Sequence, residues 1–517
     1  MKKLVLALIT LVIAFSCADL EVTPRTGETA NNIFKEGQDY RQYLAKIYAA
    51  YSLTGQDGPA GNGDISIIND EGFTSYIRAY WKAQELPTDE AVIQWNDAGI
   101  QDLNTQTWSS DNQFVRVLYY RIFYIVALAN DFLEQSTEET MNNYGIPDED
   151  RAEIAEYRTE ARFLRALAYW HALDLFRNVP LITKISTENP AQAAPEEVFS
   201  FIETELQDIE SEIAGPQQNE YGRADQAAVW MLQAKLYLNA EVYINEDRYS
   251  DVITAVNNVI SAGYTLEPDY SHLFTADNHN SNELIFTLPS DGVNSQSWGS
   301  TTFLVHAAIG GDIMDPADWG VDAGWGGLRS TDVMFNKFDT VNDARGQFFF
   351  TEGQSPEIEN LREFTDGFAF VKYSNLNSDG SEPSNLTHAD TDYPMFRLGE
   401  AYLMYAEAHL RGGGGDLNTA VGYINDLRER AYGDQSGNIA PGDLDLDFIL
   451  DERLRELSWE ATRRVDLIRF GQFTEQGIWP WKGAEQEGVT TSSHLNIFPI
   501  PAFELNANPR MKQNPNY

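Results

Sequence analysis

Apolar residues recur at helical spacing along most of the chain. Ala227, Met231, Ala234 and Leu238 lie three or four residues apart, which places them on one face of an α-helix. The same periodicity predicts further helices at Tyr40 to Ser52, Gln113 to Glu134, Arg151 to Phe176, Pro195 to Glu212 and Leu446 to Ile468. The pattern therefore predicts a mainly α protein.

Two of the helical patterns repeat each other. An Ala-Glu pair precedes a Thr-Ala-Val triplet by 14 residues in one copy, from Ala240 to Thr254, and by 13 in the other, from Ala406 to Thr419. Paired helices with small residues at their contact are the unit of tetratricopeptide-type repeats. When such pairs stack, each buries an apolar face that a single helix pair would leave exposed. Gly412 to Gly415 is then the turn between the two helices of the second copy.

One long stretch interrupts the helical pattern. Residues 265–394 are dense in Gly, Asn, Asp, Ser and aromatic residues, with short strand-like runs such as Glu283 to Thr287 and Phe368 to Tyr373. Loops of this length inside a compact protein are usually functional. We therefore expect an irregular ligand-binding lobe here, supported by helical repeats that lie mainly at 29–264 and 395–470.

The first residues of the chain predict export and lipidation. A short basic start precedes an apolar run from Leu4 to Phe15, which is typical of a signal peptide and too short to span a bilayer. Cys17, the only cysteine among 517 residues, follows almost directly. This position indicates a lipobox, in which residues 1–16 are removed and the Cys17 thiol is acylated. Residues 17–28 would then form a lipidated tether to the membrane.

Charge and cysteine content exclude several classes of protein. The chain has 36 Lys and Arg against 79 Asp and Glu, a formal net charge of −43. Such a surface repels phosphate backbones, so we expect no nucleic-acid partner. A single cysteine provides neither a disulfide framework nor a Cys-ligated zinc site. Hydrophobic residues at 43% nevertheless allow a large buried core.

No motif of a known catalytic class is present. The sequence lacks the metalloprotease, nucleophile-elbow, P-loop and dinucleotide-binding patterns, and its seven histidines form no ligand-spaced pair on a helix. We therefore predict no catalytic residues, no cofactor and no metal centre. Asp269, Asp277 and Asn278 offer oxygen atoms that could ligate Ca²⁺, but without the spacing of an EF-hand loop.

The segment from Asp451 to Arg469 alternates acidic and basic residues. Asp451 and Arg455 stand four residues apart, as do Glu460 and Arg464, a spacing at which opposite charges meet on a helix surface. We interpret the segment as a helix surface with internal ion pairs and not as an anion-binding site.

Tryptophans in polar loops are the most informative candidates for binding. Four of them stand beside Gly, Asp or Asn, namely Trp95, Trp298, Trp319 and Trp325. Flat apolar rings next to short polar side chains suit sugars, which present C–H faces for stacking and hydroxyl groups for hydrogen bonds. The same rings could instead anchor their loops by burial. The candidate glycan-binding residues are Trp95, Asn96, Asp97, Trp298 and Trp325.

Motifs spread over almost the whole chain resemble the SusD/RagB family of outer-membrane nutrient-binding lipoproteins of Bacteroidetes. The motifs that carry this resemblance are Trp81 to Glu90, Glu160 to Ala166, Asp174 to Leu181, Trp325 to Arg329, Phe396 to Leu403, Asp466 to Gly471 and Phe498 to Pro501. The resemblance implies a SusD-like domain over residues 29–517, with tetratricopeptide-like helix hairpins supporting the irregular lobe. It also implies that Trp95, Asn96, Asp97 and Trp325 fall where starch-binding members carry ligand-contacting residues.

The resemblance further implies a function and a place. Members of the family are surface-exposed lipoproteins of the outer membrane, anchored here through Cys17, that cap a TonB-dependent SusC-like transporter and pass oligosaccharides to it. They are not expected to be enzymes. The expected ligand is an oligo- or polysaccharide, and an α-glucan is one candidate. Two alternatives are a protein that binds peptides or glycoproteins, and a scaffold that docks the transporter without a glycan site of its own.

Overall fold

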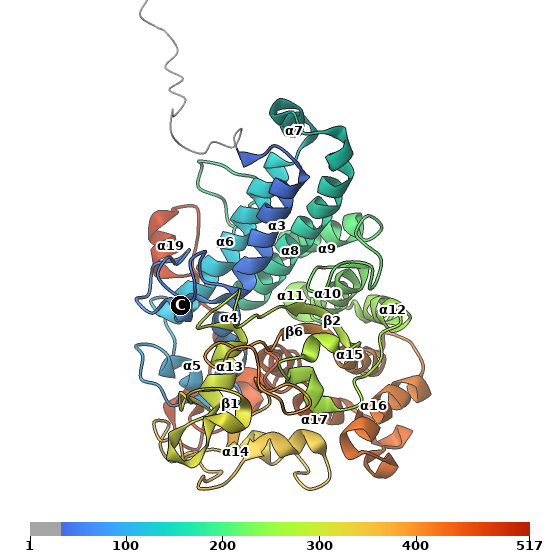
Figure 1. Cartoon of the computed structure of the whole chain (residues 1–517). Coiled ribbons are helices and arrows are strands. Elements are labelled where there is room, and N and C mark those ends of the chain that lie inside the picture. Colours follow the sequence, from blue (N-terminus) through green and yellow to red (C-terminus); the bar gives the residue numbers. More distant parts are fainter. Residues whose placement is uncertain (1–32) are drawn as a thin grey trace, which may run out of the picture.

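Helices form the frame of the protein, and a loop-rich lobe packs against them (Figure 1). The computed structural model describes residues 33–517. The predicted signal peptide, the lipidated Cys17 and the tether lie outside the described residues, so these assignments and the domain boundaries stay predictions. Within 33–517, no helix combines the length and the apolar character that crossing a bilayer requires.

The first half of the chain packs four long helices side by side. They are α3 (Gly37–Ser52), α6 (Gln113–Gln135), α8 (Arg151–Phe176) and α9 (Pro195–Ile209), with α8 at the centre of the group (Figure 1). The predicted bounds of α8 are confirmed at both ends, and those of the other three hold to within three residues. Asn112 fixes the start of α6, because its side chain accepts hydrogen bonds from the backbone N–H groups of Phe114 and Val115.

The predicted repeat is confirmed as two stacked helix pairs. The first pair is α10 (Gln226–Leu238) with α12 (Tyr249–Ile260), and the second is α15 (Leu398–Leu410) with α16 (Leu417–Tyr432). α12 packs on α15, so the two pairs form one layer although the whole lobe separates them in sequence. Gly413 allows the turn after α15 to approach the start of α12 closely, because a Cβ atom there would stand 2.4 Å from the Tyr249 carbonyl oxygen.

The prediction of one helix from Leu446 to Ile468 is wrong in one respect, because the segment forms two helices. α17 (Leu446–Leu457) and α18 (Arg463–Arg469) are separated by a turn in which Trp459 and Ala461 have φ angles of 62° and 57°. The turn exists because the Trp459 side chain is fully buried, and its carbonyl accepts a 2.9 Å hydrogen bond from the indole of Trp81. Burial of one aromatic ring thus overrides the helical periodicity of the segment.

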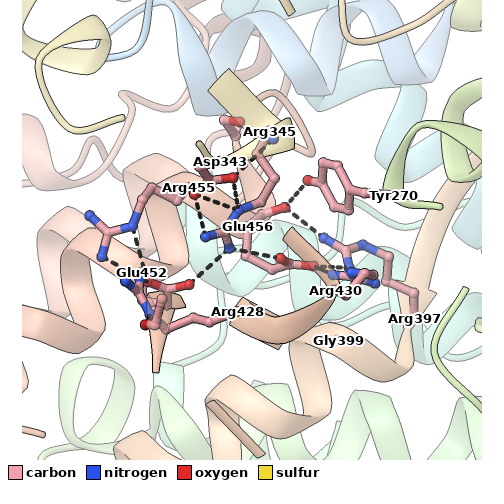
Figure 2. A network of polar contacts seen from close by, with 12 residues as sticks. Tyr270, Asp343, Arg345, Arg397, Gly399, Arg428, Arg430, Glu452, Arg455 and Glu456 are labelled. Atoms are coloured by element: carbon pink, nitrogen blue, oxygen red, sulfur yellow. Dashed lines mark hydrogen bonds and ion pairs between the residues drawn. The ribbon is translucent and has the colours of Figure 1, made fainter. Parts of the chain in front are cut away.

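The charges of this segment are not a helix surface, contrary to the prediction. Figure 2 shows Glu452 and Glu456 of α17 inside a buried network of arginines. Arg345 reaches both carboxylates, at 2.8 and 3.1 Å, and Arg397 lies 2.7 Å from Glu456. Burial alone would raise the pKa of Glu452, but the charges of the surrounding guanidinium groups outweigh it and lower this pKa to about 2. The network therefore joins the lobe to the helical frame.

Neither predicted pair at four-residue spacing forms, and three of the four side chains pair with distant segments instead. Asp451 pairs with Lys337, and Arg455 with Glu452. Glu460 contacts Arg397 and Lys372, whereas Arg464 pairs with Asp174 at 2.9 Å. The side chains on this part of the chain therefore serve tertiary contacts, which a local spacing rule does not describe.

The lobe contains three two-stranded antiparallel sheets. β1 (Ala91–Ile93) pairs with β3 (Leu328–Ser330), β2 (Leu284–Leu288) with β6 (Tyr393–Arg397), and β4 (Phe349–Phe350) with β5 (Ala369–Phe370). The strand-like runs predicted around 283–287 and 368–373 correspond to β2 and β5. The shorter helices are α4 (Tyr76–Glu85), α5 (Gln101–Thr105), α7 (Glu138–Tyr144), α11 (Ala240–Ile244), α13 (Ser300–Ala308), α14 (Asp332–Phe335) and α19 (Ala502–Ala507).

Candidate functional site

Pairing of β1 with β3 brings two of the candidate tryptophans together from 230 residues apart. Beyond Ile93 the ladder continues, since the Gln94 N–H donates to the Gly327 carbonyl at 2.8 Å. The Trp95 indole N–H then donates to the Trp325 carbonyl at 3.2 Å, and the two ring centroids are 6.4 Å apart. Gly327 makes this approach possible, because a Cβ atom there would lie 2.8 Å from the Trp95 ring.

Trp325 is held between two further rings. The imidazole of His306, on α13, stacks on it with centroids 4.7 Å apart and planes at 22°. Burial lowers the pKa of His306, so this imidazole is neutral and stacks as an apolar ring. Trp298 also lies near Trp325, with ring centroids 6.1 Å apart, and Trp298 in turn packs on His388 at 4.4 Å. Three tryptophans from three loops therefore form one continuous aromatic surface.

A buried arginine lies behind the aromatic surface. The guanidinium of Arg78, from α4, is 4.2 Å from the Phe73 ring and 5.4 Å from the Trp95 ring, within reach of cation–π attraction. Its Nη1 also donates a 2.9 Å hydrogen bond to the Trp298 carbonyl. Burial lowers the pKa of Arg78 to about 10, which still leaves it charged at neutral pH. Arg78 therefore ties the Trp95 and Trp298 segments to the helical frame.

The three tryptophans open onto a pocket of about 730 Å³. A loop over residues 60–71 forms the facing wall and contributes Ile65, Ile68, Asp70 and Glu71. This loop is braced by Glu71, which accepts hydrogen bonds from the Thr54 hydroxyl and the Gly61 N–H. A pocket of this size with aromatic walls and a few polar groups fits a small organic ligand or several sugar rings.

Four of the five candidate residues line this single pocket, namely Trp95, Asp97, Trp298 and Trp325. Asn96 is exposed and does not belong to the wall. Within the described residues, the indole N–H groups of Trp298 and Trp325 donate no hydrogen bond to the protein and are not buried. They are therefore open to a ligand, although ligand contact by all five residues stays a prediction.

Part of the pocket was missed by the sequence reasoning. Phe73, Arg78 and the loop over 60–71 carry no recognisable binding motif. The one sequence feature that indicates a loop here is its glycine content, since the stretch Gly55 to Asp64 has four glycines in ten residues. Such a stretch marks a loop, but it does not reveal which pocket the loop borders.

The candidate Ca²⁺ ligands act separately, as hydrogen-bond partners of backbone groups. Asp269 accepts from the Ser271 N–H at 3.0 Å, and Asp277 accepts from the Ser378 N–H at 2.8 Å. The Asn278 amide donates to the carbonyls of Leu273 and Asp392. Among residues 33–517, no three His, Cys, Asp or Glu side chains are grouped so that they could hold a metal ion.

Comparison with known sequences gives a consistent set of relatives. The sequence model described as the SusD family matches residues 345–517. The chain is 34% identical to "Starch-binding protein SusD" of Bacteroides thetaiotaomicron, over 96% of this chain and 95% of that protein. It is 25% identical to "SusD-like protein P2" of Formosa agariphila, over the full length of both chains.

Comparison with solved structures shows the same fold. "Surface glycan-binding protein A" from Bacteroides thetaiotaomicron in complex with laminarihexaose superposes with a TM-score of 0.71 at 21% identity, over 93% of this chain and all of that one. A SusD superfamily protein from Bacteroides vulgatus gives a TM-score of 0.73 at 19% identity, over 94% of this chain and all of that one. At these identities the likeness establishes the fold alone.

Proposed function

The chain belongs to the SusD family, and we propose that it is a non-catalytic, surface-exposed lipoprotein that binds oligo- or polysaccharide in its tryptophan pocket. By "tryptophan pocket" we mean the pocket lined by Trp95, Trp298 and Trp325. We further propose that lipidated Cys17 anchors the protein in the outer membrane. From there it delivers its ligand to a TonB-dependent SusC-like transporter.

The observation that carries the proposal is the convergence of Trp95, Trp298 and Trp325 on one open pocket. The ring of Trp325 is tilted by 40° against that of Trp95 and by 49° against that of Trp298. The three rings therefore match the shape of a curved ligand better than that of a flat one. Pyranose rings stack their C–H faces on such platforms, and the two free indole N–H groups are donors for sugar hydroxyls. A curved chain of glucose units, as in an α-glucan, suits this arrangement.

The charges at the pocket favour a neutral glycan. Its wall contains three carboxylates, Asp70, Glu71 and Asp97, and one cation, Arg78. Arg78 is 96% buried beneath aromatic rings, so the carboxylates dominate the field that a ligand meets. Uronate or sulfate groups would be repelled, whereas the hydroxyl groups of neutral sugars can donate hydrogen bonds to these carboxylates.

Binding without catalysis agrees with the roles of these carboxylates. Glycoside hydrolysis requires two carboxyl groups free to act on the scissile bond. Asp70 is engaged by the Gly72 N–H at 3.0 Å, and Glu71 holds the loop through Thr54 and Gly61. Asp97 is left as a single carboxylate without a free partner in the pocket wall.

The first prediction concerns the tryptophans, and calorimetric titration of the full chain in detergent micelles tests it. The titrants are soluble starch, maltoheptaose, laminarin and, as an anionic glycan, polygalacturonate. Trp325→Ala and Trp298→Ala should each weaken binding about thirtyfold, because truncating a central tryptophan typically costs about 2 kcal/mol.

Trp230→Ala is the matched control, since Trp230 is half-buried on α10 and bonds Glu210 away from the pocket. It should bind as the unchanged protein does. Failure of every neutral glycan to bind a correctly folded protein would refute the proposal.

One observation favours a second candidate function, the binding of basic peptides. The three carboxylates in the pocket wall and the net charge of −43 would both attract a cationic chain. Titration with a lysine-rich peptide in the same series distinguishes the two functions. Saturable peptide binding that Trp325→Ala abolishes, in the absence of glycan binding, would establish the second function.

A further inference from the structure

The hydrogen-bonding state of the indole groups separates the tryptophans into three classes. All eleven lie within the described residues. Five indole N–H groups donate to other parts of the protein, those of Trp81, Trp95, Trp108, Trp230 and Trp481. Three others are buried without a partner, those of Trp170, Trp459 and Trp479. Trp298, Trp319 and Trp325 remain, with indole N–H groups that are neither bonded nor buried. Two of these three line the tryptophan pocket, and Trp319 does not.

Trp319 lines a different pocket, of about 390 Å³, which shares no wall residue with the tryptophan pocket. The Phe350 side chain of β4 meets the Trp319 ring edge to face, with centroids 6.1 Å apart. Both side chains are half-buried, so part of each ring is open to a ligand. We call this cavity the Trp319 pocket.

The backbone beneath Trp319 is fixed and not a loose loop. Its carbonyl accepts a 3.0 Å hydrogen bond from the Asn375 N–H. The next residue, Gly320, has a φ of 70°, and a Cβ atom there would stand 2.7 Å from the Asn375 carbonyl carbon. The side chain of Asn375 donates in turn to the Gly320 carbonyl at 3.0 Å. Trp319 is therefore presented on a rigid turn, which lowers the entropic cost of using it as a binding platform.

The polar groups of the Trp319 pocket suit a neutral ligand with hydroxyl groups. Within the described residues, the Asp318 carboxylate and the Gln347 amide take part in no intramolecular hydrogen bond, and both side chains lie in exposed positions of the wall. The one cation of the wall, Lys372, is fully buried and ion-paired with Glu460 at 2.6 Å. It therefore offers no free positive charge to an anion. Flat rings with amide and carboxylate partners are the groups that bind sugars.

We propose that the Trp319 pocket is a second binding position for neutral oligosaccharide, separate from the tryptophan pocket. This inference rests on the proposed function, because it assigns a further contact to the same class of ligand. A polysaccharide long enough to reach both pockets would bind the second one at a high effective concentration. The second position therefore increases the apparent affinity for polymers.

Fluorine NMR on the full chain labelled with 5-fluorotryptophan tests the inference residue by residue. Trp298→Phe, Trp319→Phe, Trp325→Phe and Trp230→Phe assign the four resonances, and that of Trp230 serves as the internal control. Maltoheptaose and laminarihexaose are the probes. We expect saturable shifts of the Trp319 resonance, at higher concentration than those of Trp298 and Trp325, while the Trp230 resonance stays in place.

The outcomes separate the inference from the proposed function. A static Trp319 resonance with moving Trp298 and Trp325 resonances overturns the inference alone. A moving Trp319 resonance with static Trp298 and Trp325 resonances supports the inference and overturns the proposed site. If no resonance moves with either probe, both are overturned.

Affinity for a polymer provides an independent test. Trp319→Ala should weaken the apparent affinity for soluble starch about tenfold or more, because the polymer loses the gain that a second, linked binding position supplies. Trp230→Ala should leave that affinity unchanged, and near-ultraviolet circular dichroism verifies the fold of both variants. Equal starch affinity of folded Trp319→Ala and the unchanged protein would overturn the inference.

Discussion

At the residue scale, the tryptophan pocket depends on small groups as much as on its rings. Gly327 leaves room for the Trp95 ring, and Gly72 leaves room for Trp298, whose Cβ would lie 2.7 Å from a Cβ at that position. Arg78 then fixes the Trp298 backbone from below. The positions of the rings are therefore set by residues that do not themselves stack on a ligand.

The prediction at this scale is that Gly327→Ala weakens glycan binding about tenfold. The added methyl group would meet the Trp95 ring at 2.8 Å and push it out of line with Trp325. Because rigid platforms bind best, even a small displacement reduces the affinity. Calorimetric titration with the glycan bound by the unchanged protein measures the loss.

Gly422→Ala is the control for this change. Gly422 lies within α16, and a Cβ atom there meets nothing within 4 Å. Alanine should therefore stabilise the helix by about 0.5–1 kcal/mol and leave binding unchanged. Unchanged binding by Gly327→Ala as well would show that the Trp95 ring position is not critical.

At the element scale, α17 connects the lobe to the repeats through its buried face. Glu456 meets Arg345, Arg397 and Arg430, of which two come from the lobe side of the network and one from α16 (Figure 2). Each of these guanidinium groups is buried, so its charge needs a nearby carboxylate. Buried ion pairs between arginines and glutamates therefore hold the lobe to the helical frame.

The prediction at this scale is that Glu456→Gln destabilises the protein by about 3 kcal/mol or more. The substitution keeps the volume but leaves three buried guanidinium groups with one carboxylate fewer, and uncompensated buried charge costs about 3–5 kcal/mol. Urea unfolding followed by circular dichroism measures the change.

Asp451→Asn, on the exposed side of the same helix, is the control. Asp451 and Lys337 form a pair in which both side chains are about one-third exposed, 32% and 37%. Such pairs contribute at most about 1 kcal/mol. Similar losses for the two substitutions would contradict a special role for the buried network.

At the scale of the whole molecule, two groups of buried carboxyls make stability depend on pH in opposite directions. Arginines lower the pKa of Glu452 and of Asp466 to about 2. Burial raises the pKa of Glu90 to about 7, and burial together with the nearby Glu90 carboxyl raises the pKa of Glu85. The first group is ionised in the folded protein, and the second retains protons that the unfolded chain has already released.

The prediction at this scale is a stability optimum at about pH 4–5. The contribution of Glu452 and Asp466 is complete above their unfolded pKa values of about 4 and is lost as the pH falls toward 2. The contribution of protonated Glu90 is complete below about 4.5 and is lost as the pH rises through 7. Thermal unfolding between pH 2 and 8 measures both limbs.

Glu90→Gln separates the two limbs. In the unchanged protein the backbone N–H of Trp459 donates to the Glu90 carboxyl at 3.0 Å. Glutamine keeps an oxygen that can accept this hydrogen bond, but it has no carboxyl proton to release. The variant should lose less stability than the unchanged protein between pH 5 and 8 and should show the same loss in acid. An unchanged slope above pH 5 would contradict the assignment to Glu90.

The sequence by itself determined the fold class and the unit of its architecture. Helical periodicity located α8 from Arg151 to Phe176, and the repeated Ala-Glu and Thr-Ala-Val pattern located the stacked pairs. Local spacing is enough to predict these helices, because the buried face of an amphipathic helix carries an apolar residue every three or four positions. The residues that flank Trp95, Trp298 and Trp325 also identified them as binding candidates, because short polar neighbours mark a loop.

Only the tertiary structure decided which candidates meet and which charges are buried. Trp95 and Trp325 become neighbours through a strand pair whose members are more than 200 residues apart, and no local pattern encodes that pairing. The break at Trp459 and the partners of Glu456 likewise depend on the space left by distant segments. Sequence patterns report local periodicity, whereas pockets and buried ion pairs arise from contacts between distant segments.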